Sequence, residues 1–247
     1  IVNDMSELDV DGELIGNTHI AEENNNIFVS ISSSVLSSKI GIEKLDQAVQ
    51  KLLSNQDPEM IIIETSGSCH PMPLIEYFKA QTKVKLTGVF VLVDSLMLAH
   101  DFNYGELLIP KMQENIIAGK RDTINLLVEQ ILFCSHLIIT KTDRIETEKL
   151  PDIATYIQQI NPSASTHSVI FGKLTIESLF ELQEYDYFKV DQLIKELIKF
   201  SIAVKNHLFI FKQSQRPSEP RNFVTSETFH FINVQVTKPP LVQHNSF

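Results

Sequence analysis

Residues 61–73 read IIIETSGSCHPMP, and this stretch decides the fold. Its three consecutive isoleucines belong to the apolar run Met60–Ile63, which predicts a strand buried on both sides, as in a parallel sheet covered by helices. Glu64 leaves this strand, and Gly67 follows three residues later. A carboxylate at that point can hold a metal-bound water, and a glycine lets the backbone approach a phosphate. The alternative for this motif alone is an ordinary helix cap and turn after a strand.

Strand-like runs of the same kind recur along the chain and alternate with segments of helical period. The other runs are Ile27–Ile31, Leu86–Val93, His136–Ile139 and Ser168–Phe171. Two sets of apolar residues between runs each fall on one helical face: Ile42, Leu45, Val49 and Leu52, and Ile153, Tyr156, Ile157 and Ile160. This alternation predicts an α/β fold with a doubly wound, mainly parallel sheet.

The composition and the pattern of the sequence change after a predicted helix around Val190–Ala203. Gln213–Asn222 (QSQRPSEPRN) is polar and proline-rich, which is typical of a linker. His207–Lys212 and Thr228–Val236 alternate enough to form strands. We therefore expect an α/β domain over residues 1–204, followed at 205–247 by a linker and a small, partial C-terminal α+β unit.

Composition narrows the class of protein. The 247 residues are 43% hydrophobic and 21% charged, as in an ordinary globular protein, and carry a formal charge of -10. This charge argues against binding nucleic acid or an anionic membrane surface. No apolar run is long enough to span a bilayer. The two cysteines, Cys69 and Cys134, are too few for a disulfide framework, so we expect a reducing, cytoplasmic location.

A second motif follows the run His136–Ile139 and reads Thr140-Lys141-Thr142-Asp143. A carboxylate here can accept hydrogen bonds from N1–H and the N2 amine of guanine, and a lysine stem can lie across the ring. Adenine has no amine on that edge, so such a site would reject it. The motif is weak alone, but it gains weight at the end of a buried strand downstream of an ExxG.

Four segments, in this order and spacing, resemble the CobW family of GTPases. They are the predicted switch I at residues 2–11 (VNDMSELDVD), the predicted switch II at 61–73, Val91–Asp94 (VLVD), and 130–143, which begins QI and ends LIITKTD. The resemblance extends from residue 1 to about residue 183. It implies a P-loop GTPase-type fold that binds GTP and GDP with Mg²⁺, in a protein that delivers metal to a metalloprotein client.

The resemblance also implies roles for particular residues. The residues that would bind the nucleotide are Thr140, Lys141 and Asp143 at the base, Gly67 at the γ-phosphate, Asp4 on switch I and Gly172 in the last turn that contacts the base. Glu64 would be the catalytic residue, because it would order a Mg²⁺-bound water. Oligomeric state does not follow from the sequence.

One departure from the family pattern concerns the phosphates. No G-x-x-x-x-G-K-[ST] occurs in the sequence, since Gly119-Lys120 is followed by Arg121 and has no glycine at the required distance before it. This motif supplies the backbone amides and the lysine that hold the β- and γ-phosphates. Because the first residue is Ile1 rather than Met, we expect the phosphate loop to lie upstream. The alternative is a non-catalytic interaction module with a GTPase fold.

A second departure concerns the metal. The family's Cys-x-Cys-Cys motif aligns with Ser30, Ser32 and Ser33, and serine is a poor ligand for soft or borderline cations. Cys69 and His70, after Gly67, are the candidate zinc ligands, and Glu7 could add a carboxylate. Two alternatives stay open: a half-buried thiol beside a solvated histidine, or a redox-sensitive thiol.

Overall fold

The computed structural model describes residues 1–4, 29–55, 58–173, 185–193, 195 and 232–237. Its strands form one seven-stranded sheet in the order β2-β1-β3-β7-β4-β5-β6. All of the pairings are parallel except those of β7. The strands are β1 (Val2–Asp4), β2 (Ser30–Ser32), β3 (Met60–Thr65), β4 (Lys85–Asp94), β5 (His136–Thr140), β6 (Ser165–Ser168) and β7 (Ile232–Thr237). The predicted mainly parallel α/β class is confirmed.

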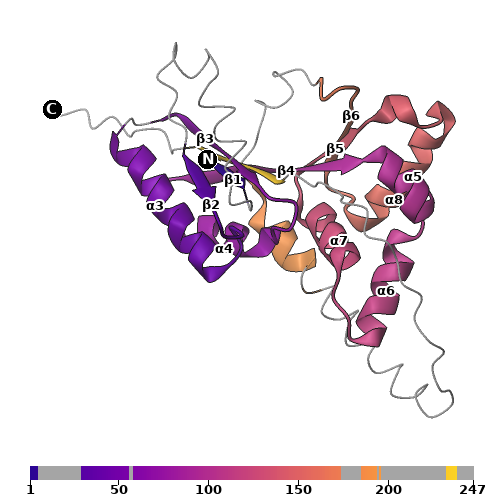
Figure 1. Ribbon diagram of the computed structural model, residues 1–247, viewed down its shortest axis with the longest axis horizontal. Helices are drawn as coiled ribbons and strands as arrows, with labels where there is room; N and C mark the ends of the chain where they lie inside the picture. The colour runs from indigo at the N-terminus through magenta and orange to yellow at the C-terminus, as the bar shows by residue number, and fades with distance from the viewer. Residues whose placement is uncertain (5–28, 56–57, 174–184, 194, 196–231, 238–247) are drawn as a thin grey trace.

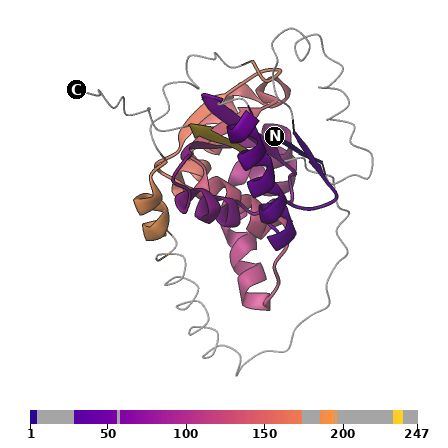
Figure 2. The same ribbon diagram turned by 90° about the vertical axis from the view of Figure 1, so that its left-hand side faces the viewer.

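The described helices connect successive parallel strands. They are α3 (Lys39–Asn55), α4 (Pro71–Lys79), α5 (Ser95–Phe102), α6 (Leu108–Ala118), α7 (Thr123–Phe133) and α8 (Leu150–Ile160), with short 3₁₀ turns at Asn103–Gly105, Thr142–Arg144 and Thr147–Lys149. From β2 to β6 every connection moves the same way across the sheet. Right-handed crossovers therefore place these helices on one face, and Figures 1 and 2 show α3 and α4 below the strands.

The side chains of the helix-covered face form the core. Ile61 and Ile63 of β3, Val91 of β4, and Leu137 and Ile139 of β5 are all buried there. The predicted helical faces pack against this layer: Leu45, Val49, Leu52, Ile153, Ile157 and Ile160 are all buried. Burial of each such side chain contributes on the order of 1.5–3 kcal/mol. This core fixes the relative positions of the strand ends that carry the predicted site.

The opposite face of the sheet, called here the second face, is more open. Ile62 on this face is 56% exposed, whereas Ile61 and Ile63 on either side of it are buried. Leu92 and Ile138 are half-buried. None of the six helices whose bounds are given above lies on the second face, so the apolar run at residues 61–63 is fully buried on one side only.

Strand β7 differs from the sequence prediction. We expected Thr228–Val236 in a small C-terminal unit, but Ile232–Thr237 lies antiparallel between β3 and β4 in the main sheet. The alternation that predicted a strand was correct, and the partner of that strand cannot be read from a local pattern. The other predicted strand of that unit, His207–Lys212, lies outside the described residues.

Two strands and one helix also differ in their bounds. The strand expected at Ser168–Phe171 is β6 at Ser165–Ser168, and the one expected at Ile27–Ile31 is β2 at Ser30–Ser32. At the predicted helix Val190–Ala203, residues 187–193 and 195 are helical, and residues 196–203 lie outside the described part. No helix in the described residues is long and apolar enough to cross a membrane.

Candidate functional site

The predicted nucleotide-binding residues lie along one edge of the sheet. Strands β1, β3, β4 and β5 all point the same way, so their carboxyl ends meet at this edge, where ligands of open α/β sheets bind. The residues at or just beyond these ends are Asp4, Glu64, Gly67, Asp94, Thr140, Lys141 and Asp143, with Gly172 after β6. Glu7 lies outside the described residues.

The loop after β5 is held from both neighbouring strands. Thr140 Oγ1 donates to the carbonyl oxygen of Val93 at 3.3 Å. Thr142 Oγ1 is buried and donates to the carbonyl oxygen of Val169 at 3.1 Å. Because Thr142 points inward, the next residue, Asp143, is turned out to solvent at the edge. Its carboxylate is thus available to a ligand on a loop whose backbone is fixed.

Lys141 adopts a left-handed backbone conformation with φ 55°. Its ammonium nitrogen donates to Oδ2 of Asp94 at 2.5 Å, and its carbonyl oxygen accepts a hydrogen bond from Oγ of Ser95 at 3.0 Å. Burial alone would raise the pKa of the Asp94 carboxyl. Hydrogen bonds from Lys141 and from the backbone N–H of Leu96 outweigh burial and hold the pKa below its ordinary value. Asp94 therefore stays ionised and holds the lysine.

The turn after β6 borders the same loop. Val169 N–H donates to the carbonyl oxygen of Ile139 at 2.8 Å, and Phe171 and Gly172 follow with φ of 52° and 66°. Phe171 is 80% exposed. A bulky residue with positive φ is uncommon and carries strain. The turn thus presents an exposed ring and a glycine beside the loop that carries Asp143.

Glu64 lies at a distance from that loop. It is paired with Asn233 of β7, which is paired with Phe90 of β4, so Glu64 is level with a residue four positions before Asp94. Strand spacings make the separation of the two carboxylate-bearing positions about 15 Å. Both positions are on the second face, as the pairing shows. The motif at Glu64–Gly67 and the motif at Thr140–Asp143 are therefore far enough apart to contact opposite ends of one extended ligand, and too far apart to contact one compact ligand together.

The loop after β3 is tied to α7. The side-chain amide of Gln130 is fully buried and donates to the carbonyl oxygens of Gly67 at 3.0 Å and Cys69 at 3.2 Å. Cys69 N–H donates to the carbonyl oxygen of Ser66 at 3.0 Å. Sequence reasoning missed this role of Gln130. A glutamine in an otherwise apolar helical face was the available signal.

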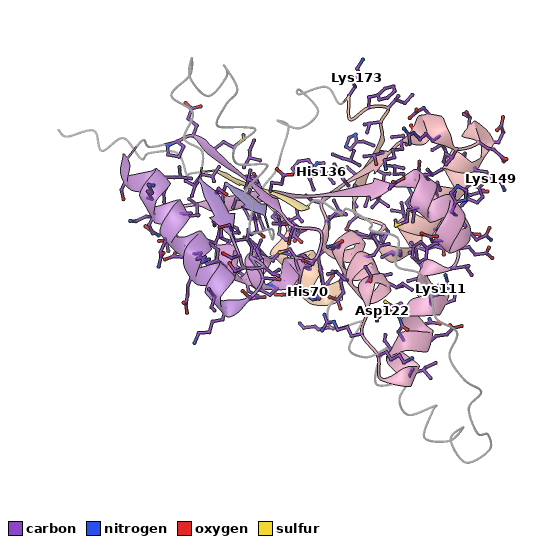
Figure 3. All side chains as sticks on the ribbon, in the orientation of Figure 1. His70, Lys111, Asp122, His136, Lys149 and Lys173 are labelled. Atoms are coloured by element: carbon purple, nitrogen blue, oxygen red, sulfur yellow. The ribbon has the colours of Figure 1, made fainter. Side chains whose placement is uncertain are left out.

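The two candidate metal ligands of this loop point in different directions. Cys69 is completely buried beside Ser37 and Thr65, and burial raises the pKa of its thiol. The His70 ring is partly exposed and lies 3.4 Å from Oε2 of Glu129, which also binds Arg121. Figure 3 shows His70 among the helices. No cluster of three or more potential ligands occurs in the described residues, so zinc binding by Cys69, His70 and Glu7 stays a prediction.

A cavity of about 350 Å³ lies at the other edge of the sheet, at the amino ends of β5 and β6. Its lining includes Cys134, His136, Asn161 and Tyr185. Asn161 donates to three backbone carbonyls, and the Tyr185 hydroxyl donates to the carbonyl oxygen of Phe133. These polar groups serve the packing of the chain, and the cavity is remote from the strand ends that carry the two motifs.

Comparisons with known proteins identify a family and relatives that the chain resembles in sequence. The model of the family described as CobW/HypB/UreG, nucleotide-binding domain, matches residues 1–168. The chain is 28% identical over 190 residues to zinc-regulated GTPase metalloprotein activator 1 of Dictyostelium discoideum, covering 69% of this chain and 40% of that protein. It is 23% identical over 158 residues to zinc chaperone CobW of a Sinorhizobium species, covering 61% of this chain and 44% of that protein. The chain thus spans less than half the length of these relatives. No solved structure matches it.

Proposed function

The chain belongs to the CobW/HypB/UreG nucleotide-binding family, and from this premise we propose that it is the GTP-binding and GTP-hydrolysing domain of a metal-insertion chaperone. The observation that carries the proposal is the loop Thr140–Asp143. It is held from β4 and from the turn after β6, while Asp143 is exposed to solvent beyond the carboxyl end of β5.

Asp143 would select guanine. An ionised carboxylate only accepts hydrogen bonds, and guanine offers N1–H and an N2 amine side by side. Adenine offers an acceptor and no amine there, so binding would leave the carboxylate unpaired. The stem of Lys141 would lie on the base, and backbone groups at Gly172 would border it. Asp143 is exposed and the lysine is already held, so both fit this task without rearrangement.

Glu64 and Gly67 would act at the other end of the nucleotide. A half-buried carboxylate at a strand end suits a Mg²⁺ ion bound through water, because Mg²⁺ prefers oxygen ligands and retains several waters. When bound, Mg²⁺ neutralises charge on the phosphates. Glu64 would orient its water, the backbone at Gly67 would meet the γ-phosphate, and Asp4 at the end of β1 would belong to the first switch.

The metal-handling part of the proposal rests on the family and on the printed names of the two relatives. Loss of the γ-phosphate would let the loop that contains Gly67, Cys69 and His70 rearrange, and so change contact with a metalloprotein client. Zinc would be the transported ion, in a cytoplasmic protein. The rival function is a partner-binding module without turnover. A GxxxxGK[ST] in the natural full-length protein would support the GTPase, and its absence from that protein would support the module.

Calorimetry with GDP and ADP on the natural full-length protein tests the nucleotide assignment. We expect tighter binding of GDP, and loss of this preference in Asp143→Ala. The matched control is Asp152→Ala, which removes another exposed carboxylate, on α8. Equal affinity of the native protein for both nucleotides would refute guanine recognition.

Measurement of phosphate release from GTP distinguishes between the two proposed functions, a GTPase and a non-catalytic module. We expect Glu64→Gln to lower the hydrolysis rate by about 10²–10³, the range for loss of one well-placed catalytic group, while GDP affinity is kept. A native protein that binds GDP but releases no phosphate supports the partner-binding module instead.

A further inference from the structure

The side chain of Lys141 is fixed at both of its ends. At the backbone end, its carbonyl oxygen accepts hydrogen bonds from Ser95 Oγ and from Arg144 N–H, both at 3.0 Å. Ser95 is completely buried, so this contact is part of the core. These bonds stabilise the left-handed conformation of Lys141, which a residue with a side chain rarely adopts.

At the ammonium end, the partner is itself held in place. Asp94 is the N-cap of α5: its Oδ1 accepts from the backbone N–H of Leu96 at 2.8 Å and of Met97 at 3.4 Å. That leaves Oδ2 to bind the lysine at 2.5 Å. The carboxylate also lies at the positive end of the α5 dipole, which favours its ionised form. Asp94 therefore joins the start of α5 to the loop after β5.

We propose that Asp94 is a positioning residue for nucleotide binding: it holds the ammonium group of Lys141 so that the lysine stem is a preformed apolar surface for the purine ring. This inference rests on the proposed function. The register of the sheet supplies the geometry, because Asp94 and Thr140 are direct partners and Lys141 follows Thr140. A lysine side chain in solution is flexible, and fixing it before the ligand arrives lowers the entropy cost of binding.

The roles of Asp94 and Asp143 are then separable. Asp143 would read the edge of the base, whereas Asp94 would act through the lysine on the face of the ring. A stem lying on the ring does not distinguish guanine from hypoxanthine, which lacks only the N2 amine. Loss of Asp94 should therefore weaken binding of GDP and of inosine diphosphate (IDP), whose base is hypoxanthine, by the same factor. Loss of Asp143 should instead reduce the preference for GDP over IDP.

The test is a double-mutant cycle on GDP affinity with Asp94→Asn, Lys141→Met and the double variant of the full-length protein. Asparagine caps a helix about as well as aspartate, so α5 is retained, and methionine keeps an apolar stem without the ammonium. We expect Asp94→Asn to weaken GDP and IDP binding each roughly tenfold, within the range of coupled pairs. The double variant should be no weaker than the weaker single variant. Asp191→Asn, which breaks the surface pair with Lys79, is the control.

Three outcomes would overturn the inference. Unchanged GDP affinity in Asp94→Asn means that the ion pair has no part in binding. Additive losses in the double variant mean that Asp94 acts by itself and not through Lys141. The role of Asp94 is structural only if a fall in Tm accounts for the loss of GDP affinity. The same fall would then be seen in Asp94→Ser, which retains the helix cap, and in Asp191→Asn. If the native protein prefers GDP and Asp143→Ala removes that preference, these outcomes leave the proposed function intact; a native protein that binds neither nucleotide refutes both.

Discussion

Gln130 donates from its side-chain amide to the carbonyl oxygen of Gly67 at 3.0 Å, across a separation of 63 residues. Gln130 belongs to α7, and α7 leads directly into β5 and the loop that carries Asp143. The predicted γ-phosphate loop is therefore attached to the element that places the predicted base-binding loop. A change in the state of one loop has a direct structural route to the other.

Replacing Gln130 should release the loop after β3. In Gln130→Leu the carbonyls of Gly67 and Cys69 lose their buried donor, at a cost of about 1–3 kcal/mol. We expect the thiol of Cys69, completely buried in the native protein, to react faster with a thiol reagent. The measurement uses Cys134→Ser protein so that one thiol remains, and Gln158→Leu at an exposed site of α8 is the control. Equal reaction rates in all three proteins would mean that Gln130 does not hold the loop.

Zinc affinity should increase when the loop after β3 opens. Cys69 faces the core and His70 faces Glu129, so both can reach one ion only after the loop rearranges. We expect weak zinc affinity in the native protein, tighter affinity in Gln130→Leu, and loss of binding in Cys69→Ser. Affinity should rise with pH, because the raised pKa of the Cys69 thiol makes the proton harder to displace.

Competition with a chromophoric chelator measures these affinities. The comparison is the triple variant Ser30→Ala/Ser32→Ala/Ser33→Ala, because these serines align with the cysteines of the family's metal motif. If the serine variant abolishes binding and Cys69→Ser does not, the proposed ligands are wrong.

Proline at Val234 should destabilise the whole sheet. Val234 lies in the middle of β7, paired with Ile63 on one side and Val89 on the other. A proline in a central strand removes a ladder hydrogen bond and leaves a carbonyl without its donor, at a cost of about 1–3 kcal/mol, or roughly 2–12 °C in Tm for a domain of this size. Val234→Ala keeps the backbone N–H and is the control. A main unfolding transition at an unchanged Tm in Val234→Pro would show that β7 belongs to a separate unit.

Lowering the pH should lower the stability of the folded protein, and protonation of His136 should account for part of this loss. Its ring stacks on Phe90 at 4.7 Å between centroids and faces His167 at 6.1 Å, on the second face (Figure 3). Burial and the charge of His167 lower the pKa of His136 from its ordinary 6.5. The unfolded chain therefore binds the proton more tightly, so this contribution to stability is complete above pH 6.5 and is lost as pH falls through the folded pKa.

Urea unfolding of native protein and His136→Phe at pH 7.5 and 5.5 checks this contribution. We expect native protein to lose more stability than His136→Phe over this interval, and His100→Phe, at an exposed site, to behave like the native protein. An equal loss in all three would contradict the assignment.

The central strands could be predicted from the sequence because burial leaves a local pattern. The runs at 61–63, 86–93 and 136–139 all lie in strands β3, β4 and β5. Strand β6 was misplaced because it is an edge strand of polar residues, STHS, and the apolar residues after it form a turn in which Phe171 has positive φ. An edge strand with weakly buried side chains gives no hydrophobic signal.

The positions of Asp143 and Glu64 in the fold could be predicted because Glu64 lies near the end of one recognisable strand and Asp143 follows another. The ion pair of Asp94 with Lys141 could not, because it joins residues 47 apart through the register of β4 and β5. The sequence also did not reveal that Cys69 and His70 point in different directions. His70 is the N-cap of α4, where the backbone changes conformation, and adjacency in sequence does not fix the direction of two side chains at such a point.

The most direct test of guanine recognition is a change of specificity at Asp143. An asparagine there would offer an N–H to the C2 carbonyl of xanthine, whereas the carboxylate of Asp143 would accept from the N2 amine of guanine. Affinities for GDP and xanthosine diphosphate are measured by calorimetry on native full-length protein, Asp143→Asn and the control Asp152→Asn. We expect native protein and the control to prefer GDP and Asp143→Asn to prefer xanthosine diphosphate. An Asp143→Asn protein with the native preference would contradict the assignment of Asp143 to the base, and with it the account of this edge as a guanine-nucleotide site.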